Sequence, residues 1–376
     1  MGPLHGIKII EMAGIGPGPF CAMMLADFGA DVVRVDRADA GDLGIPVDPL
    51  RDVLNRGKRS IVLDLKSADG KKTAMQLIAQ ADALVEGFRP GVMERLGLGP
   101  DACLALNPRL VYGRITGWGQ EGPLAQAAGH DINYIAIAGA LGAIGRKGEA
   151  PIAPLNLIGD FGGGGVYLAL GIACALIEAR GSGKGQVVDA AMLDGATSLM
   201  TFLYGMLANG QWSETRGNNL IDGGAPWYDT YMTADGEYIA VGAIEDRFYR
   251  AFVAGLGLDL AELPARSDKT RWPQLQALFA GRIAERSRSE WVTAFAGIDA
   301  CVTPVLALRE VFEHPQVAQR HTFVEHFGMK QPAPAPRFSR TPAAIRRRPP
   351  RPGEHTEEIL AELAKRQPEG AAAPAD

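Results

Sequence analysis

The N-terminal segment constrains the fold of this chain most strongly. Apolar runs predict strands at residues 7–12 and 31–36, and between them lie a glycine- and proline-rich turn and a helical pattern, residues 14–19 and 20–28. A strand, a helix and a second strand within about 30 residues form a βαβ unit, whose strands are parallel. We therefore expect an α/β protein with a parallel sheet.

The turn at residues 14–19 is only loosely similar to a dinucleotide-binding loop. Pro17 and Pro19 lack the backbone N–H groups that such a loop directs at a pyrophosphate. We therefore expect no nicotinamide cofactor at this turn.

Basic residues follow several predicted strands. Further strands are expected at residues 61–65, 83–86, 110–115 and 186–191, and residues 51–60 form a loop with four basic side chains. Arg37, Lys66 and Arg89 each come just after a strand, at the edge where parallel sheets bind ligands. Because several cations together favour phosphate, they indicate a phosphate-rich ligand. The alternative is a solvated basic rim, since most Lys and Arg side chains are exposed.

Composition argues against several classes of protein. The net charge of −5 provides no global basic field for nucleic acid. No apolar run approaches the ~18–20 residues of a membrane span, and the longest, residues 166–177, is too short. The four cysteines lie far apart without C-x-x-C pairing. Residues 1–6 lack a basic region followed by an apolar region, so we expect no secretory signal. We expect a cytoplasmic protein with reduced thiols and no metal site.

The sequence changes character after Trp227. Residues 228–243 predict a β-hairpin with an Asp-Gly turn, and three helical patterns follow. We expect the chain to divide into a large domain, a linker helix and loop, a small α+β domain and a C-terminal segment, at residues 1–190, 191–226, 227–320 and 321–376.

One histidine and one aspartate stand in glycine-rich settings thirty positions apart. His130 lies in the segment 129–134, and Asp160 precedes four consecutive glycines, residues 162–165. A histidine can act as a general base near neutral pH, and a carboxyl at the start of a helix can act as an acid, a base or a nucleophile. Each glycine costs a helix about 1 kcal/mol relative to alanine, so we expect a close approach to the backbone there.

These residues also have structural interpretations. Asp160 could cap a helix, and the glycines could simply allow close packing. His130 could be a packed, hydrogen-bonded histidine. Glu245, at the end of the predicted hairpin, could be an exposed loop acid or could orient His130 as a third group orients a base.

With these residues in view, the chain resembles the family III CoA-transferase and racemase superfamily (CaiB/BaiF type), and most closely its branch of α-methylacyl-CoA racemases. The superfamily motifs cover nearly the whole chain and lie at residues 11–19, 29–36, 55–60, 63–66, 86–91 and 353–356. The resemblance to the racemase branch rests on residues 129–134, 159–164 and 242–245.

The resemblance implies a large Rossmann-like domain, a smaller α+β domain and a C-terminal segment that returns to the large domain. It also implies an interlocked homodimer with active sites at the subunit interface. His130 and Asp160 would be the acid/base pair, and Glu245 would support His130 from the partner subunit. The CoA part of an acyl-CoA thioester would be held at Arg37, Leu63, Asp64, Leu65, Lys66, Gly87, Phe88, Arg89, Arg95, Gly129, Asp131, Ile132, Asn133 and Tyr134.

The expected reaction is epimerisation at the α-carbon of a 2-methylacyl-CoA thioester, with no separate cofactor because CoA is part of the substrate. Inversion needs a base on one face and an acid on the other, with donors for the enolate oxygen, for which the amide of Asp131 is the candidate. With neutral His130 as base, Asp160 must begin protonated, which implies a raised pKa. The alternative is CoA transfer between carboxylic acids through an aspartyl-CoA thioester at Asp160, which does not need His130.

Overall fold

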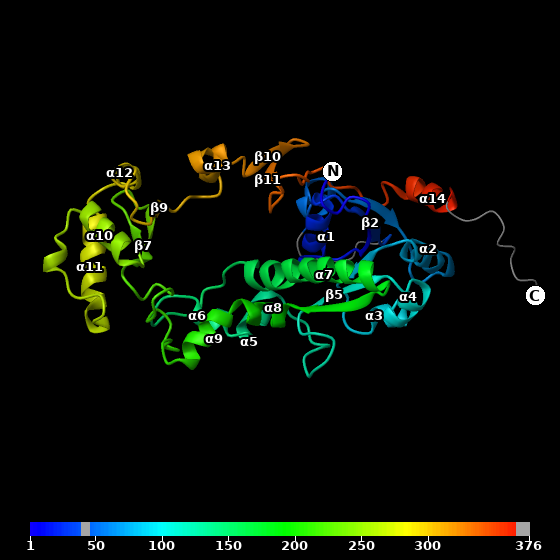
Figure 1. Ribbon diagram of the computed structural model, residues 1–376, viewed down its shortest axis with the longest axis horizontal. Helices are drawn as coiled ribbons and strands as arrows, with labels where there is room; N and C mark the ends of the chain where they lie inside the picture. Colours follow the sequence, from blue (N-terminus) through cyan, green and yellow to red (C-terminus); the bar gives the residue numbers. More distant parts are fainter. Residues whose placement is uncertain (39–45, 366–376) are drawn as a thin grey trace, which may run out of the picture. The chain divides into compact units, whose positions relative to one another are not determined.

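The computed structural model describes residues 1–38 and 46–365, which form two compact units (Figure 1). The first unit contains Met1–Ala138, Leu155–Leu199 and the chain from Gln319 onward, and the second contains Gly139–Pro154 and Met200–Ala318. These boundaries differ from the predicted domains, because residues 139–154 belong to the second unit and residues 191–199 to the first. Residues 366–376 of the predicted C-terminal segment lie outside the described residues.

A six-stranded parallel sheet forms the centre of the first unit. Its strands follow the order β3-β2-β1-β4-β5-β6. This is the strand order of a doubly wound Rossmann sheet, so the predicted α/β class is confirmed. The order reverses between β1 and β4, and ligands in such sheets bind where the strand order reverses. The strands are β1 (Lys8–Met12), β2 (Asp31–Asp36), β3 (Arg59–Val62), β4 (Ala83–Glu86), β5 (Val111–Thr116) and β6 (Gln186–Ala191).

Helices cover both faces of this sheet. On one face, α1 (Pro17–Asp27) and α7 (Tyr167–Ser182) pack on side chains such as Ile9, and on the other, α2 (Ala68–Ala79) packs on side chains such as Ile10. Successive strand residues point to opposite faces, so both must be apolar. The remaining helices of this unit are α3 (Val92–Arg95), α4 (Pro100–Leu106), α5 (Asp131–Ile137), α8 (Met192–Leu199) and α14 (Thr356–Lys365).

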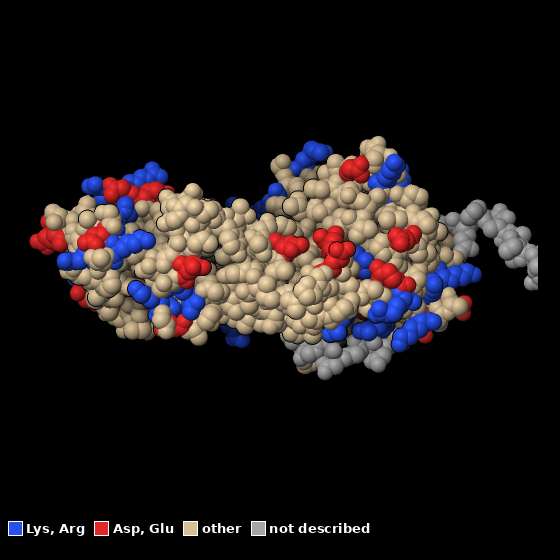
Figure 2. Space-filling view, turned by 90° about the horizontal axis from the view of Figure 1, so that it is seen from below, with Lys and Arg blue, Asp and Glu red and all other residues tan. Residues whose placement is uncertain are grey.

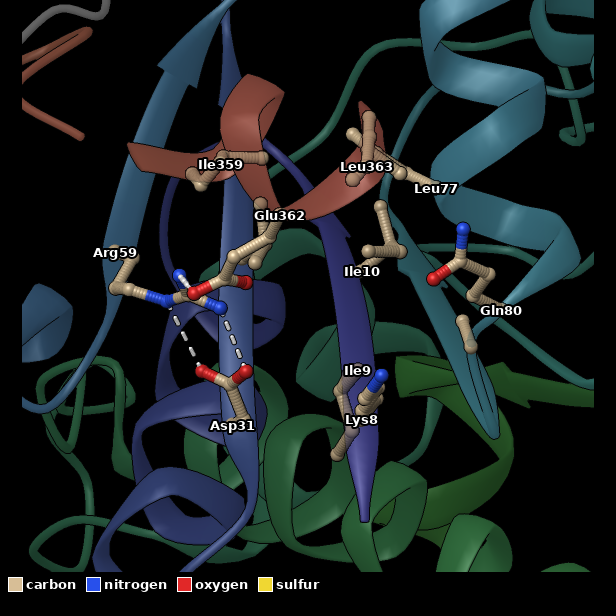
Figure 3. Close-up of a pocket in the computed structure, with 12 residues that line it drawn as sticks. Lys8, Ile9, Ile10, Asp31, Arg59, Leu77, Gln80, Ile359, Glu362 and Leu363 are labelled. Atoms are coloured by element: carbon tan, nitrogen blue, oxygen red, sulfur yellow. Dashed lines mark hydrogen bonds and ion pairs between the residues drawn. The ribbon is translucent and has the colours of Figure 1, made fainter. Parts of the chain in front are cut away.

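The C-terminal segment returns to the first unit, as predicted. A short hairpin, β10 (Phe323–His326) and β11 (Met329–Pro332), precedes an extended stretch and α14. Ile359 and Leu363 of α14 lie over the sheet beside Leu77 of α2, above a small cavity of about 40 Å³ (Figure 3). Arg59 joins these parts, since its guanidinium binds Asp31 at 2.7 Å as well as two glutamates of α14.

The predicted basic loop at residues 51–60 buries most of its charges. Arg56 pairs with Asp27 of α1 at 2.7 Å, and the Lys58 ammonium lies 2.7 Å from the Glu11 carboxylate, with both side chains 0% exposed. Only Arg51 projects into solvent, at 75% exposure. The loop is therefore a set of buried ion pairs, because carboxylates of α1, β1 and β2 face it.

Elsewhere, on the face drawn in Figure 2, acidic and basic side chains are intermingled.

One helical run is longer than the sequence suggested. The predicted helix from residue 166 begins earlier, as a π-helical stretch, η3 (Leu157–Val166), that continues into α7. The combined 26-residue run Leu157–Ser182 is long and apolar enough to cross a membrane, so the expectation of no such run was wrong. Leu168, Ile172 and Leu176 of this run are buried against the sheet, where a core helix belongs.

The second unit is built on a small antiparallel sheet. The strands β7 (Tyr228–Met232), β8 (Tyr238–Gly242) and β9 (Val302–Pro304) pair in that order, and the predicted hairpin turn is present, with Gly236 at a φ of 79°. Aromatic side chains, including Trp227, Phe252 and Trp291, form its core. Its helices are α6 (Ala140–Ala143), α9 (Thr201–Ala208), α10 (Asp246–Gly255), α11 (Trp272–Ile283), α12 (Arg288–Ala294) and α13 (Pro315–Gln319).

Replacing Lys58 by methionine should destabilise the protein by about 3–5 kcal/mol, because it leaves the buried Glu11 charge without a partner. The double variant Lys58→Met/Glu11→Leu should recover most of that loss. Urea denaturation measures both effects, with the exposed Arg51→Ala as a control that changes stability by less than about 0.5 kcal/mol. An unchanged unfolding midpoint for Lys58→Met would contradict a supporting role for the pair.

Candidate active site

Two helix starts bring the predicted acid–base residues together in the first unit. His130 is the residue that precedes α5, and Asp160 lies in the first turn of η3. Asp131 joins them, because one oxygen of its buried carboxylate accepts hydrogen bonds from the backbone N–H of Gly159 at 2.6 Å and of Asp160 at 2.7 Å. A single side chain therefore ties the residue after His130 to the backbone of Asp160.

The segment that carries His130 is anchored at the end of β5. The Tyr134 hydroxyl donates to the Gly129 carbonyl, and the Tyr134 ring packs edge-on against Trp118 with centroids 4.8 Å apart. A Cβ atom on Gly129 would lie 2.8 Å from the Tyr134 ring, so this position requires glycine. The His130 N–H donates to the side chain of Asn133 at 3.0 Å, and the His130 side chain itself is exposed. A fixed backbone thus presents an accessible imidazole.

The Asp160 carboxyl is half-buried. Its Oδ2 accepts a hydrogen bond from the Asn156 side chain at 3.2 Å, and a Cβ atom on Gly16 would lie 3.3 Å from the same oxygen. Burial is the largest effect on the pKa of Asp160 and raises it, and the Asp131 charge raises it further. The Asn156 hydrogen bond and the charge of His130 lower it, but the net shift is upward. Asp160 therefore holds its proton to a higher pH than an ordinary aspartate.

The helix cap is a different residue from the one that the sequence suggested. Asp160 accepts no backbone N–H of η3 among the hydrogen bonds of the described residues, whereas Asp131 accepts two of them. The carboxylate at the start of η3 therefore comes from α5. Asp160 is left with one side-chain partner, Asn156, which lies four residues earlier on the same helical face.

Three of the four glycines make room for protein. A Cβ atom on Gly163 would lie 2.5 Å from the amide nitrogen of Ala196 in α8, and one on Gly165 would lie 2.9 Å from the carbonyl oxygen of Pro17 in α1. A Cβ atom on Gly164 would meet Met192 at 2.9 Å. The expected close approach to the backbone at positions 163–165 is therefore made by the protein itself, as in the close-packing interpretation.

The strand-end cations share one edge of the sheet. Arg37 follows β2, Lys66 follows β3 and Arg89 follows β4, and these strands are parallel in the order β3-β2-β1-β4. All three side chains are exposed. The Gly-Pro turn that leads from β1 into α1 lies at the same edge and contains Gly16, which neighbours Asp160. The edge therefore combines a basic rim with the Asp160 carboxyl.

The other predicted CoA-binding positions divide by exposure. Asp64, Gly87, Arg95, Ile132 and Asn133 are exposed, and Leu65, Phe88 and Gly129 are half-buried. The side chains of Leu63, Asp131 and Tyr134 are buried. Leu63 and Tyr134 pack in the core and Asp131 binds η3, so at these three positions only the backbone is left for a ligand.

Glu245 belongs to the second unit. It is the exposed residue that precedes α10, and Arg266 supports this corner by donating to the Ile244 carbonyl at 2.8 Å. The Arg266 guanidinium also lies over the rings of Trp227 and Tyr249. Support of His130 by Glu245 stays a prediction. Within the described residues no group of three or more His, Cys, Asp or Glu side chains is arranged to hold a metal ion.

Sequence reasoning missed the contacts around Asp160. The bridging role of the Asp131 carboxylate and the approach of Gly16 both join segments far apart in the chain. Asn156 could have been found, since four residues of helical spacing place it beside Asp160.

Comparisons with known proteins agree with this geometry. The model of CoA-transferase family III matches residues 4–356. The α-methylacyl-CoA racemase of Mus musculus is 48% identical over 97% of this chain and 94% of its own length, and that of Homo sapiens is 50% identical over 96% and 93%. The human succinyl-CoA:glutarate CoA-transferase is 31% identical over 96% and 86%. The crystal structure of a CaiB/BaiF family protein from Brucella suis has a TM-score of 0.84 at 28% identity, covering 96% of this chain and 99% of that one.

The packing of the glycine run can be tested with two alanine variants. Gly163→Ala should lower stability by about 1–3 kcal/mol, because the new Cβ meets the backbone of α8. Gly181→Ala, further along the same helical run, meets no atom within 4 Å and should be neutral or stabilising by up to about 1 kcal/mol. Urea denaturation of both variants makes the comparison. Equal stabilities would show that η3 and α8 are not closely packed.

Proposed function

The chain belongs to CoA-transferase family III, and on that basis we propose that it inverts the α-carbon of 2-methylacyl-CoA thioesters. The activity would be that of an α-methylacyl-CoA racemase, an isomerase. Two findings support the proposal: near half identity to racemases over almost the full chain, and the junction at Asp131 that holds His130 and Asp160 in one site. The second observation supports the two-base reaction in particular, because that reaction needs two groups in fixed relation.

The chemistry follows from the α-hydrogen of a thioester, which is moderately acidic. Removing it on one face and returning a proton on the other inverts the carbon, with a planar enolate between the two steps. In one direction neutral His130 is the base and protonated Asp160 is the acid, and in the other direction the roles are exchanged. Both directions need the pair to hold one proton in total, so activity should fall at low pH and at high pH.

The upward shift of the Asp160 pKa suits this role. An ordinary aspartate near neutral pH is almost always ionised and cannot donate a proton. Burial favours the neutral carboxyl, so a larger fraction of Asp160 is available as an acid. The enolate oxygen would be stabilised by the backbone N–H of Asp131, which lacks an intrahelical acceptor because Asp131 is the first residue of α5.

The CoA part would be held at the carboxyl edge of the sheet. We assign the phosphates of CoA to Arg37, Lys66 and Arg89, which are exposed and follow strands of that edge, and to the exposed Arg95 at the end of α3. The same edge contains the turn beside Asp160, so a thioester attached to CoA could reach the acid–base pair.

We further propose a homodimer in which the partner subunit completes each site with its own Glu245. The outer face of the helical run formed by η3 and α7 supports association, since Val166 at the end of η3 and Leu170 and Ile177 of α7 are exposed, with 43%, 58% and 71% of each residue accessible. Contiguous exposed apolar surface of this kind marks an interaction site. The carboxylate of Glu245 would orient the His130 imidazole as a third group orients a base.

A deuterium experiment tests the reaction. Incubation of a (2R)-2-methylacyl-CoA with the protein in D2O should give α-deuterated product with inversion, without any carboxylate acceptor. The alternative reaction, CoA transfer, would instead place the thioester on an added acceptor and leave Asp160 trappable by hydroxylamine. That second outcome would replace racemisation by transfer.

His130 and Glu245 can be tested together. His130→Ala should abolish inversion while the affinity for CoA is unchanged, because the imidazole acts on the α-carbon alone. Glu245→Gln chains should also be inactive, because His130 then lacks the carboxylate that orients it. When the two inactive chains are unfolded, mixed and refolded, about a quarter of wild-type activity should return, since half of the dimers are mixed and each mixed dimer has one intact site.

Two results would count against these assignments. Inversion by the His130→Ala variant would remove His130 from the acid–base pair. Absence of recovery in refolded mixtures, when refolded wild-type chains recover, would show that Glu245 does not act across subunits.

A further inference from the structure

We propose that the Asp131 side chain is a positioning residue for the acid–base pair: its carboxylate fixes Asp160 relative to His130 and keeps a negative charge beside the Asp160 carboxyl. The inference rests on the proposed function and adds to it, because it assigns a role to a buried carboxylate that the two-base reaction does not itself require. A side chain bound to CoA would have to face the ligand, whereas this one faces the start of η3.

The first argument is the placement of the carboxylate. One oxygen of Asp131 accepts from two consecutive backbone N–H groups, Gly159 and Asp160, at 2.6 and 2.7 Å. The first-turn amides of a helix stabilise a negative charge. Since Asp131 is covalently next to His130, these two bonds fix the distance between the two helix starts. A Cβ atom on Gly159 would lie 2.8 Å from this oxygen, so the glycine is needed for the contact.

The second argument concerns the other oxygen of the Asp131 carboxylate, Oδ1. Among the described residues, Asp131 Oδ1 is buried and has no hydrogen-bond partner. A buried unpaired acceptor costs about 1–3 kcal/mol, so a purely structural bridge would be better served by a smaller or neutral acceptor. The retained charge acts on its surroundings through a medium of low dielectric constant.

The third argument is the effect on Asp160. Burial is the largest cause of its raised pKa, and the Asp131 carboxylate adds to it, against the Asn156 hydrogen bond and the charge of His130. The Tyr134 hydroxyl is a further titratable group that interacts with Asp160. Burial, followed by the charges of Asp160 and Asp131, raises the pKa of Tyr134 to about 12, so this phenol stays neutral in the working range. Burial and the Asp131 charge therefore both raise the pKa of Asp160, and the charge of His130 opposes them.

The experiment compares two substitutions of Asp131. Asp131→Asn keeps an oxygen for both amides but removes the charge, so the high-pH limb of the deuterium-exchange profile should move to lower pH while the amide bonds stay. Asp131→Ala removes the bridge as well, and exchange should fall by about 10²-fold, as expected when reacting groups lose their alignment. Binding of CoA, measured by calorimetry, should be unchanged in both. Asp101→Asn, an exposed aspartate in α4, is the matched control.

A direct titration separates this inference from the proposed reaction. With ¹³C-labelled aspartate, the Asp160 carboxyl is identified by the signal that Asp160→Asn removes, and its titration should move to lower pH in Asp131→Asn. This titration needs no substrate. It would therefore still test the effect of Asp131 on Asp160 if the protein transferred CoA instead of racemising. An unmoved Asp160 titration in folded Asp131→Asn, or full exchange activity in Asp131→Ala, would overturn the proposal.

Discussion

The buried pair of Lys58 and Glu11 is the interaction on which the candidate site depends. Glu11 lies on the central strand β1, and the Lys58 ammonium is held between its carboxylate, the Asn55 side chain at 3.0 Å and the Pro19 carbonyl at 3.1 Å. Pro19 is in the first turn of α1, next to the turn that contains Gly16. One ammonium therefore fixes the β1–α1 junction, and that junction forms a wall beside Asp160. The desolvation cost of the pair is offset only because several oxygens share the charge.

A second buried charge, the Asp131 carboxylate, fixes the other side of the site in a similar way. Asp131 joins α5 to η3, and Lys58, the residue before β3, joins that strand to α1. The Asp131 carboxylate accepts hydrogen bonds from the backbone near the start of η3, and the Lys58 ammonium donates one to the backbone near the start of α1. Such junctions fix direction as well as distance, which two-base chemistry requires, since the acid and the base must face opposite sides of one carbon. The half-buried carboxyl of Asp160 then has a raised pKa, chiefly because of its burial.

The family contains both racemases and CoA-transferases on one fold, so the difference between the two reactions must lie in the residues of the site. An aspartate that stays ionised is suited to attack a thioester carbonyl, whereas one kept protonated is suited to deliver a proton. In this chain, burial and the Asp131 charge both raise the pKa of Asp160 and so favour its protonated form. In the proposed reaction His130 is the opposite base, and together these two features favour proton transfer over acyl transfer.

The sequence by itself determined the α/β class, the run of parallel strands and the basic residues after those strands, and it led to the proposal of His130 and Asp160 as the acid–base pair. These follow from local patterns: strand periodicity, turn residues and chemical type at one position. The tertiary structure alone decided that Arg56, Lys58 and Arg59 are buried in ion pairs, that Gly163–Gly165 face α1 and α8, and that Asp131 caps the helix of Asp160. Each of these joins residues distant in the chain, so the partner that satisfies a charge or fills the space beside a glycine is fixed only when the sheet and its helices pack.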